Sequence, residues 1–279
     1  MICWANTDDF EKSEIVIVGV PDESQSHSLR KGTSEAPHFI REISNIRDSY
    51  TRKGTKSIGL PLSGNFQKKV FDYGDIQREK IEEVYSKIIS KSKIPILIGG
   101  DHSISSEVIK AISKKSDPIS LVYFDAHPDF ISSTTNYYGS VFQDVLPHID
   151  IKSSIQIGIR TPEQEEIDNI KKHNLKVITP FDIVEKGVKE IANTILQTIG
   201  KNVYISFDMD SVDPAFAPGV SVPVPMGLKN VEAVYLLKAI ANQGIIGMDL
   251  MEVCPSYDIK DRTSHLASRI IAEVISSCK

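Results

Sequence analysis

The sequence predicts an α/β protein with three layers, in which a mainly parallel sheet carries helices on both faces. One observation is that short apolar runs alternate with longer segments of helical character along most of the chain. Strands that alternate with helices indicate parallel pairing and βαβ connections. A second observation is that runs such as Ile94–Ile98 are apolar at nearly every position. Strands of this kind are covered on both sides, as in a sheet between two helical layers.

The predicted elements follow one another without a long gap after residue 77. In the first half we expect strands at Glu14–Val20, Ile94–Ile98 and Ile119–Phe124, and helices at Ala36–Ile46, Gln77–Ser90 and Ser103–Lys115. In the second half we expect strands at Ser154–Arg160, Lys176–Thr179, Asn202–Phe207 and Ile245–Val253. The helices expected there are Pro162–His173, Asp182–Ile199, Leu228–Asn242 and Thr263–Ser276.

Composition limits the classes of protein that fit. The chain of 279 residues shows no linker, charge block or internal repeat, so we predict a single domain over residues 1–279. No stretch approaches the roughly 20 apolar residues of a membrane span, and Met1–Phe10 lacks a signal-peptide pattern. Three widely spaced cysteines indicate neither a disulfide framework nor a cysteine zinc site. We therefore expect a cytoplasmic protein that does not bind membranes.

The net charge of −5 argues against binding to a nucleic-acid backbone as the main role. It is compatible with a small cationic substrate, although the charge of a whole chain says little about one pocket.

Acids and histidines cluster where three apolar runs end. Leu121–Phe124 leads into Asp125, His127 and Asp129, which occupy alternate positions and would share one face of an extended chain. Val203–Phe207 leads in the same way into a second alternating pair. The third run, Ile94–Ile98, ends in two glycines, which allow a tight turn. The clusters are Asp101-His102, Asp125-Ala126-His127-Pro128-Asp129 and Asp208-Met209-Asp210.

These clusters together predict a site for two metal ions. Any one of them could simply cap a following helix, but the carboxyl ends of parallel strands meet at one edge of a sheet. Four carboxylates that face each other would repel unless cations lay among them. The set holds two imidazoles and four carboxylates and no thiolate, which favours manganese over structural zinc. The predicted ligands are His102, Asp125, His127, Asp129, Asp208 and Asp210.

Several segments resemble the ureohydrolases, the family of arginase and agmatinase. Residues 99–103, 125–129 and 206–219 (SFDMDSVDPAFAPG) look like the three signature motifs of that family. Gly19-Val20-Pro21 and residues 32–41 resemble its opening strand, glycine-rich loop and first helix, and Asp249–Pro255 resembles its last strand. The likeness covers most of the chain and implies the arginase-like version of the predicted fold.

The resemblance implies a pair of manganese ions and a role for each ligand. One Mn²⁺ would be held by His102, Asp125, Asp129 and Asp208. The other would be held by His127 and Asp210, with Asp125 and Asp208 shared. A water between two such ions has a lowered pKa and can supply hydroxide near neutral pH.

The implied reaction is attack on the central carbon of a guanidinium group, which yields urea and an amine. Asp129 would hydrogen-bond the attacking hydroxide and help to pass on its proton. Glu252 would pair with the substrate guanidinium and orient it. The family's usual His-Gly pair is replaced here by Tyr138-Gly139. With a reference pKa of about 10, Tyr138 is a poorer proton shuttle than histidine near neutrality, so turnover would be slow, need high pH or use water instead.

Substrate identity is left open among related compounds. The segments Pro214–Gly219 and the N-terminal loop look more like those of agmatinases than of arginases, which favours agmatine, with putrescine and urea as products. Arginine, guanidinobutyrate and formimidoylglutamate are alternatives. Proteins of this kind usually form trimers or hexamers, which implies a homo-oligomer.

Two further interpretations compete with a manganese ureohydrolase. A deacetylase-like hydrolase with one zinc ion is disfavoured, because a single-metal site has no use for His102 as a second histidine ligand. A metal-stabilised protein with weak or no catalysis is suggested by Tyr138 in place of the shuttle.

Overall fold

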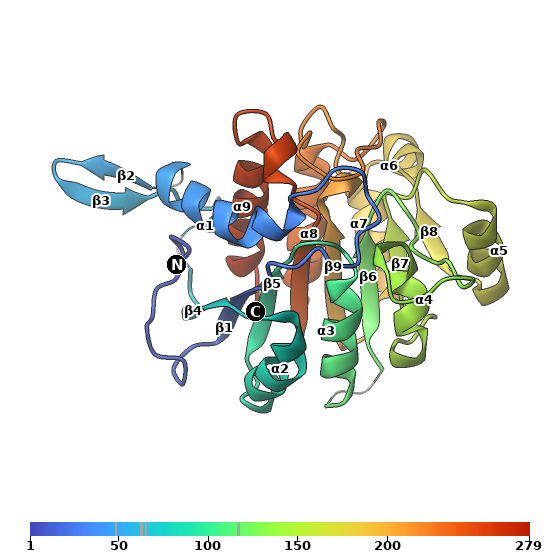
Figure 1. The fold of residues 1–279 in the computed structure, drawn as a ribbon, viewed down its shortest axis with the longest axis horizontal. Coiled ribbons are helices and arrows are strands. Elements are labelled where there is room, and N and C mark those ends of the chain that lie inside the picture. Colours follow the sequence, from blue (N-terminus) through green and yellow to red (C-terminus); the bar gives the residue numbers. More distant parts are fainter. Residues whose placement is uncertain (48, 62–63, 65, 116–117) are drawn as a thin grey trace.

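The computed structural model describes residues 1–47, 49–61, 64, 66–115 and 118–279. Within these residues, eight strands form one sheet in the order β4-β1-β5-β10-β9-β6-β7-β8, and every pairing in it is parallel. The predicted α/β fold with helices on both faces of a parallel sheet is therefore confirmed (Figure 1).

The strands are close to their predicted positions, mostly shorter by one to a few residues at their ends. The sheet strands are β1 (Ile15–Gly19), β4 (Val70–Asp75), β5 (Ile94–Ile98), β6 (Ser120–Phe124), β7 (Ile155–Ile157), β8 (Lys176–Ile178), β9 (Val203–Asp208) and β10 (Gly247–Met251). A separate antiparallel hairpin consists of β2 (Ser49–Arg52) and β3 (Thr55–Ile58), and it projects from the body of the molecule (Figure 1).

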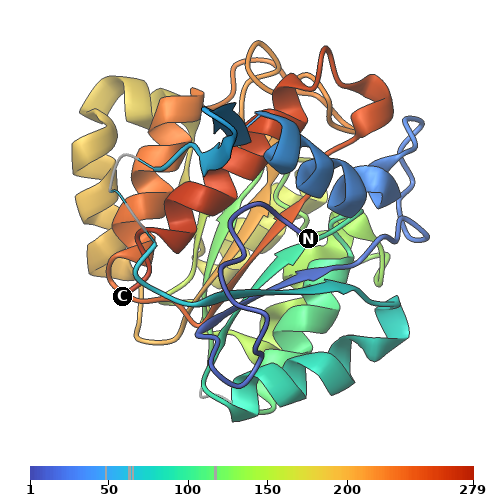
Figure 2. The ribbon, with the colours of Figure 1, turned by 90° about the vertical axis from the view of Figure 1, so that its left-hand side faces the viewer.

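The helices form two layers, one on each side of the sheet (Figure 2). The first layer contains α1 (Ala36–Arg47), α7 (Val188–Thr198), α8 (Asn230–Ala241) and α9 (Arg262–Ile275), with α6 (Pro180–Lys186) packed against α7. The second contains α2 (Ile81–Ser90), α3 (Ile104–Ser113) and α4 (Val141–Val145), and α5 (Gln164–His173) follows β7.

Two apolar cores lie on the two faces of the sheet, because successive side chains of a strand point to opposite faces. In β6, Val122 and Phe124 belong to the core beneath α1, α8 and α9, whereas Leu121 and Tyr123 belong to the core beneath α2 and α3. Every residue of β6 is buried. This two-sided burial explains why the central strands are almost continuously apolar.

Several features depart from the predicted elements, among them the short helix α4, which the sequence pattern did not predict. The sequence pattern missed both the hairpin and β4. In β4, an edge strand, buried and half-buried residues alternate, so it lacks the continuous apolar run of the central strands. The single helix expected at Asp182–Ile199 is two helices, α6 and α7, separated at Gly187. Gly187 has φ of 84°, a conformation that glycine adopts with little penalty but that cannot continue a right-handed helix.

Among the helices of the described residues, none has both the length and the apolar composition that crossing a membrane requires.

Candidate metal centre

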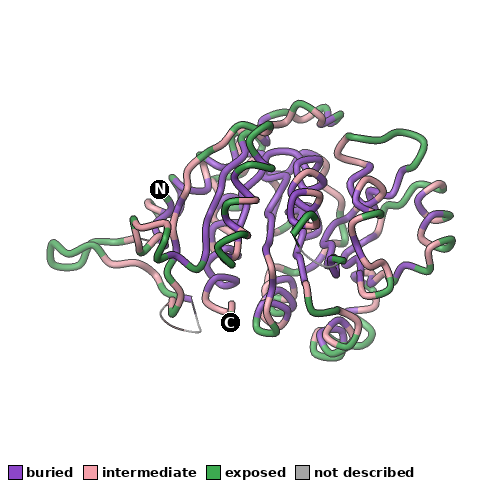
Figure 3. The backbone as a smooth tube through the Cα atoms, turned by 90° about the horizontal axis from the view of Figure 1, so that it is seen from below, coloured by how far each residue is buried: buried purple, intermediate pink, exposed green. Residues whose placement is uncertain are grey.

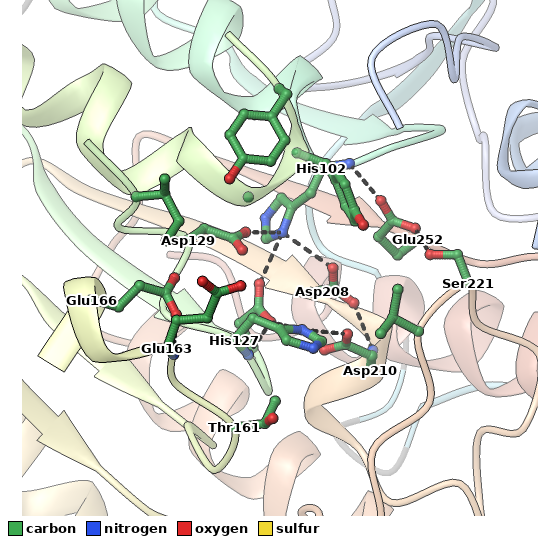
Figure 4. A pocket seen from close by; sticks show the side chains of 16 residues that line it. His102, His127, Asp129, Thr161, Glu163, Glu166, Asp208, Asp210, Ser221 and Glu252 are labelled. Carbon is green, nitrogen blue, oxygen red and sulfur yellow. Dashed lines mark hydrogen bonds and ion pairs between the residues drawn. The ribbon is translucent and has the colours of Figure 1, made fainter. Parts of the chain in front are cut away.

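The four central strands of the sheet bring the predicted site residues to one edge. β5, β10, β9 and β6 are consecutive neighbours, and their ends are in register: Ile98 pairs with Leu250, Leu250 with Phe207, and Phe207 with Phe124. The chain beyond each of these positions carries a cluster of polar residues. The parallel order therefore places His102, Glu252, Asp208 and Asp125 side by side, as Figure 4 shows for the labelled residues among them.

All the residues predicted to bind metal or substrate line one small cavity of about 140 Å³. Its walls include His102, Asp125, His127, Asp129, Tyr138, Asp208, Asp210 and Glu252.

The ligand atoms fall into two groups that share one carboxylate. His102, Asp125 and Asp129 form one group, and Asp125, His127 and Asp210 form the other. Nδ1 of His102 lies 3.0 Å from Oδ2 of Asp125, and Nδ1 of His127 lies 3.3 Å from the other oxygen, Oδ1. Asp125 thus turns one oxygen toward each histidine, which is the arrangement of a carboxylate that bridges two cations.

Asp208 lies on the His102 side of the centre. Its Oδ2 is 3.1 Å from Nδ1 of His102, while its Oδ1 accepts a hydrogen bond of 2.7 Å from the backbone N–H of Asp210. The side chain of Asp210 points to His127, with Oδ2 3.0 Å from Nδ1. The alternating pair at the end of β9 therefore serves both groups.

The donor set fits divalent cations. Two ligands at right angles on a metal with bonds of about 2.1 Å lie about 3.0 Å apart, and the distances from His102 Nδ1 to Asp125 and Asp208 are 3.0 and 3.1 Å. Oδ2 of Asp125 is buried, and it faces Nδ1 of His102 instead of a backbone or hydroxyl donor. Such an atom is costly to bury unless a cation or a donor satisfies it. The residues present therefore suit a pair of metal ions.

Burial and mutual repulsion shift the pKa values of the carboxyl groups. Burial and the neighbouring Asp125 raise the pKa of Asp129 to about 7. Burial, together with Asp210 and Asp125, raises the pKa of Asp208 well above its usual range. Burial alone would raise the pKa of Asp125 as well, but its two histidine partners lower it. In the absence of metal, the four acids cannot all be ionised cheaply, and cations would relieve this repulsion.

The pKa values of the two imidazoles are also raised, which favours their charged form. Burial lowers the pKa of His127, but Asp210 and Asp125 more than offset this and raise it to about 12. Burial also disfavours a charge on His102, yet its carboxylate neighbours raise the pKa well above the usual value. Protons on the two rings therefore stand in for the positive charge that metal ions would bring.

Two of the predicted site residues have an unusual backbone. Asp129 has φ of 48° and Glu252 has φ of 65°, both in the left-handed region that non-glycine residues seldom adopt. Packing and hydrogen bonds must hold such conformations, and they are frequent at functional sites. Here the N–H of Glu252 donates to the carbonyl of Gly100 at 2.9 Å, and the carbonyl of Asp129 accepts from Phe142 at 2.9 Å.

Glu252 is held from both sides and is 2% exposed. Its Oε1 accepts a hydrogen bond of 2.8 Å from the backbone N–H of His102, and its Oε2 accepts one from the hydroxyl of Ser221. Burial raises its pKa to about 8, although the Ser221 hydrogen bond acts in the other direction. The carboxyl group is thus fixed at the cavity wall.

A second group of acids stands across the cavity from Glu252. Glu163 and Glu166 lie beside each other on the opposite side of the metal ligands (Figure 4). Both oxygens of Glu166 accept backbone hydrogen bonds, from Phe130 and Glu163, whereas Glu163 is exposed. Among the described residues that line the cavity, none is lysine or arginine.

Several residues of the site escaped the sequence analysis. Tyr123 stacks on the ring of His102, with centroids 4.8 Å apart and planes 3° apart, and donates a hydrogen bond to Asp129. Ser206 and Asp249 reach the other nitrogen of His102 through hydrogen bonds. All three lie inside strands. Ser206 and Asp249 belong to segments that resemble the family's motifs, but the sequence analysis assigned no role to either side chain.

The loop after β1 meets the segment that contains Tyr138. The ring of His27 stacks on that of Tyr137, with centroids 5.0 Å apart, and meets that of Tyr138 edge-on, with centroids 6.0 Å apart. The backbone N–H of Tyr138 donates to the carbonyl of Gln25 at 3.4 Å. These contacts form an aromatic wall on one side of the cavity.

The family model "Arginase family" matches residues 13–276. The chain belongs to the arginase family. It is 33% identical over 272 residues to an agmatinase of Neisseria meningitidis, covering 93% of this chain and 85% of that protein. It is 29% identical over 277 residues to the human mitochondrial guanidino acid hydrolase, covering 95% and 78% of the two chains.

The fold agrees with this membership. The agmatine ureohydrolase of Thermoplasma volcanium superposes with a TM-score of 0.84 at 30% identity, covering 99% of this chain and 93% of that one. As a member of the arginase family, the protein is a metal-dependent ureohydrolase.

Proposed function

We propose that this arginase-family protein hydrolyses agmatine to putrescine and urea with two Mn²⁺ ions. The observation that carries the proposal is the pair of ligand groups that share Asp125 at the carboxyl edge of the sheet. His102, Asp125, Asp129 and Asp208 would hold one ion; His127 and Asp210 would hold the other, with Asp125 and Asp208 shared. Bound there, the two ions would supply a water of lowered pKa as the nucleophile.

The chain's own residues would position and deprotonate the reactants. Glu252 would bind the guanidinium through charge-assisted hydrogen bonds, because its carboxyl group is already fixed by Ser221 and by the N–H of His102. Asp129 would accept the proton of the attacking water and pass it on, since it lies in the same group as His102 and Asp125. A substrate bound in this small cavity would exclude bulk water from the reacting carbon.

The charge of the cavity favours agmatine over guanidino acids. Glu163 would attract the distal ammonium of agmatine, whereas a carboxylate at that end of a substrate would meet like charge without a cationic partner. Arg160 does not compensate, because its guanidinium donates to the carbonyl oxygens of Asp210, Val224 and Pro225. Arginine, guanidinobutyrate and formimidoylglutamate, which all carry a carboxylate, should therefore be poorer substrates.

Tyr138 would take the place of a histidine in delivering a proton to the leaving amine. Burial and the nearby Glu252 raise its pKa above that of a free tyrosine, so it would exchange protons slowly near neutrality. We expect urea release to increase toward alkaline pH.

We also propose a single-domain chain and a cytoplasmic location. We further propose assembly into a trimer or hexamer, and size-exclusion chromatography with light scattering would test this oligomeric state.

The experiment that tests this function is urea release by manganese-loaded protein from agmatine, arginine, guanidinobutyrate and formimidoylglutamate, the last scored as formamide release. We expect agmatine to be hydrolysed with the highest kcat/KM. A Glu163→Gln variant should lose part of its preference for agmatine over guanidinobutyrate and keep its metal content. If guanidinobutyrate were preferred by the unmodified protein, the proposed substrate would be wrong. If no compound were hydrolysed while two metals stayed bound, the non-catalytic interpretation would hold.

A further inference from the structure

We propose that Ser206 and Asp249 fix the tautomer of His102, so that its Nδ1 presents a lone pair to the metal. The inference rests on the proposed metal centre and concerns positioning residues, because neither side chain is among the predicted ligands. It assigns a role to two buried polar side chains that the proposed reaction does not use.

The three residues form a continuous chain of hydrogen bonds across the middle of the sheet. Nε2 of His102 lies 2.9 Å from Oγ of Ser206, and that hydroxyl donates to Oδ1 of Asp249 at 2.8 Å. Ser206 and Asp249 are paired in register on β9 and β10. All three side chains are almost completely buried, at 1% exposure or less. No competing solvent therefore reaches these groups.

The direction of the chain follows from a backbone donor. The N–H of Phe207 can only donate, and it points to Oδ1 of Asp249 at 3.3 Å, so this oxygen is an acceptor. The single hydrogen of Ser206 consequently goes to Asp249. The oxygen of Ser206 is then left to accept a hydrogen bond from Nε2–H of His102.

The opposite ring nitrogen is the one that faces the metal position. Nδ1 lies 3.0 Å from Asp125 and 3.1 Å from Asp208. When a cation replaces the proton on Nδ1, the hydrogen on Nε2 stays in place and Nδ1 would present its lone pair to that cation. The reverse tautomer would aim an N–H at the cation. It would also require Ser206 to donate to His102, which would leave two acceptors, Ser206 and Asp249, facing each other at 2.8 Å.

Neighbouring aromatic residues hold both ends of the chain. The hydroxyl of Tyr204 donates to Oδ2 of Asp249 at 2.8 Å, which fixes the rotation of that carboxyl group. Tyr123 stacks on the imidazole of His102 and fixes the plane of the ring. Hydrogen bonds beyond the ligands commonly tune metal affinity by 10- to 100-fold.

The test is a calorimetric titration of metal-free protein with Mn²⁺, which does not depend on any substrate. Ser206→Ala should weaken one of the two binding events by about 10- to 100-fold and leave the other within about threefold. Ser206→Thr keeps the hydroxyl and should restore most of the affinity. Ser154→Ala is the matched control, because Ser154 is equally buried and its hydroxyl donates to the backbone carbonyl of Asp150, away from His102, Ser206 and Asp249.

The outcomes separate this inference from the proposed function. Unchanged binding of both ions to Ser206→Ala, in a variant that unfolds at the same temperature as Ser154→Ala, would overturn the inference. Equal weakening by Ser154→Ala would also overturn it, because a general packing defect would then explain the loss. If Ser206→Ala alone loses affinity while the unmodified protein releases no urea, the inference stands and the proposed reaction fails.

Discussion

Replacing Glu252 by glutamine should stabilise the metal-free protein at alkaline pH and abolish most of its activity. Glu252 is completely enclosed, and burial raises its pKa from 4.5 to about 8. A group whose pKa is higher in the folded state contributes fully to stability below the pKa of the unfolded state, and this contribution is lost as pH rises through the folded value. Folding therefore becomes less favourable between pH 4.5 and about 8 on account of this one group.

The size of the effect follows from the same two values. A difference of about 3.5 units corresponds to about 5 kcal/mol at roughly 1.4 kcal/mol per unit, which sets an upper limit at pH 9. Glutamine carries no charge, and it can accept from the N–H of His102 with its oxygen while its amide group donates to Ser221. We expect a gain of a few kcal/mol at pH 9 and almost none at pH 5.

The assay is urea denaturation of the metal-free protein at both pH values, monitored by circular dichroism. Glu163→Gln removes an exposed carboxylate from the same cavity and should change stability by less than about 0.5 kcal/mol. A Glu252→Gln protein that is less stable than the unmodified chain at pH 9, or equally changed at both pH values, would refute the reasoning. In the loaded enzyme, losing charge-assisted hydrogen bonds to guanidinium should lower kcat/KM at least about 100-fold.

Three other predictions concern the metals, the proton path and the fold. Asp125→Asn should reduce bound manganese from two ions to one or none per chain, because Asp125 belongs to both ligand groups; two ions found by elemental analysis after dialysis would contradict the shared role. Tyr138→His should move the rise of urea release toward neutral pH by about one unit or more, and an unchanged pH profile would show that this residue does not deliver the proton. Gly187→Ala should destabilise the protein by about 1–3 kcal/mol, because φ of 84° with ψ of 146° is a combination that few residues other than glycine adopt. The control Gly200→Ala, where a methyl group meets only ordinary contacts at 3.5 Å, should stay near the unmodified value in the same denaturation experiment.

The sequence by itself determined the fold class and the residues at the strand ends. Parallel strands place polar residues at one edge, so the alternation of Asp125, His127 and Asp129 after an apolar run already indicates a shared face. The same local reasoning pointed to Asp208 and Asp210. The fold-class prediction is confirmed, because hydrophobic periodicity is a local property of the chain.

Only the tertiary structure decided which groups meet. The order β5-β10-β9-β6 is a long-range property, and it places Glu252 and Asp249 between elements that are far apart in sequence. Nothing near Ser206 in the chain reveals that its hydroxyl lies between His102 and Asp249. The left-handed backbone of Glu252 likewise follows from its hydrogen bond to Gly100 across the sheet edge.

The elements that sequence patterns missed have the same physical origin. β4 is recognised as a strand through its pairing with β1, because its own residues alternate only weakly between buried and half-buried positions. Pairing partners, hydrogen-bond direction and desolvation depend on which strands become neighbours. A local sequence pattern therefore identifies the chemical groups at each strand end. Packing determines the distances between these groups, their pKa values and the contacts that orient them.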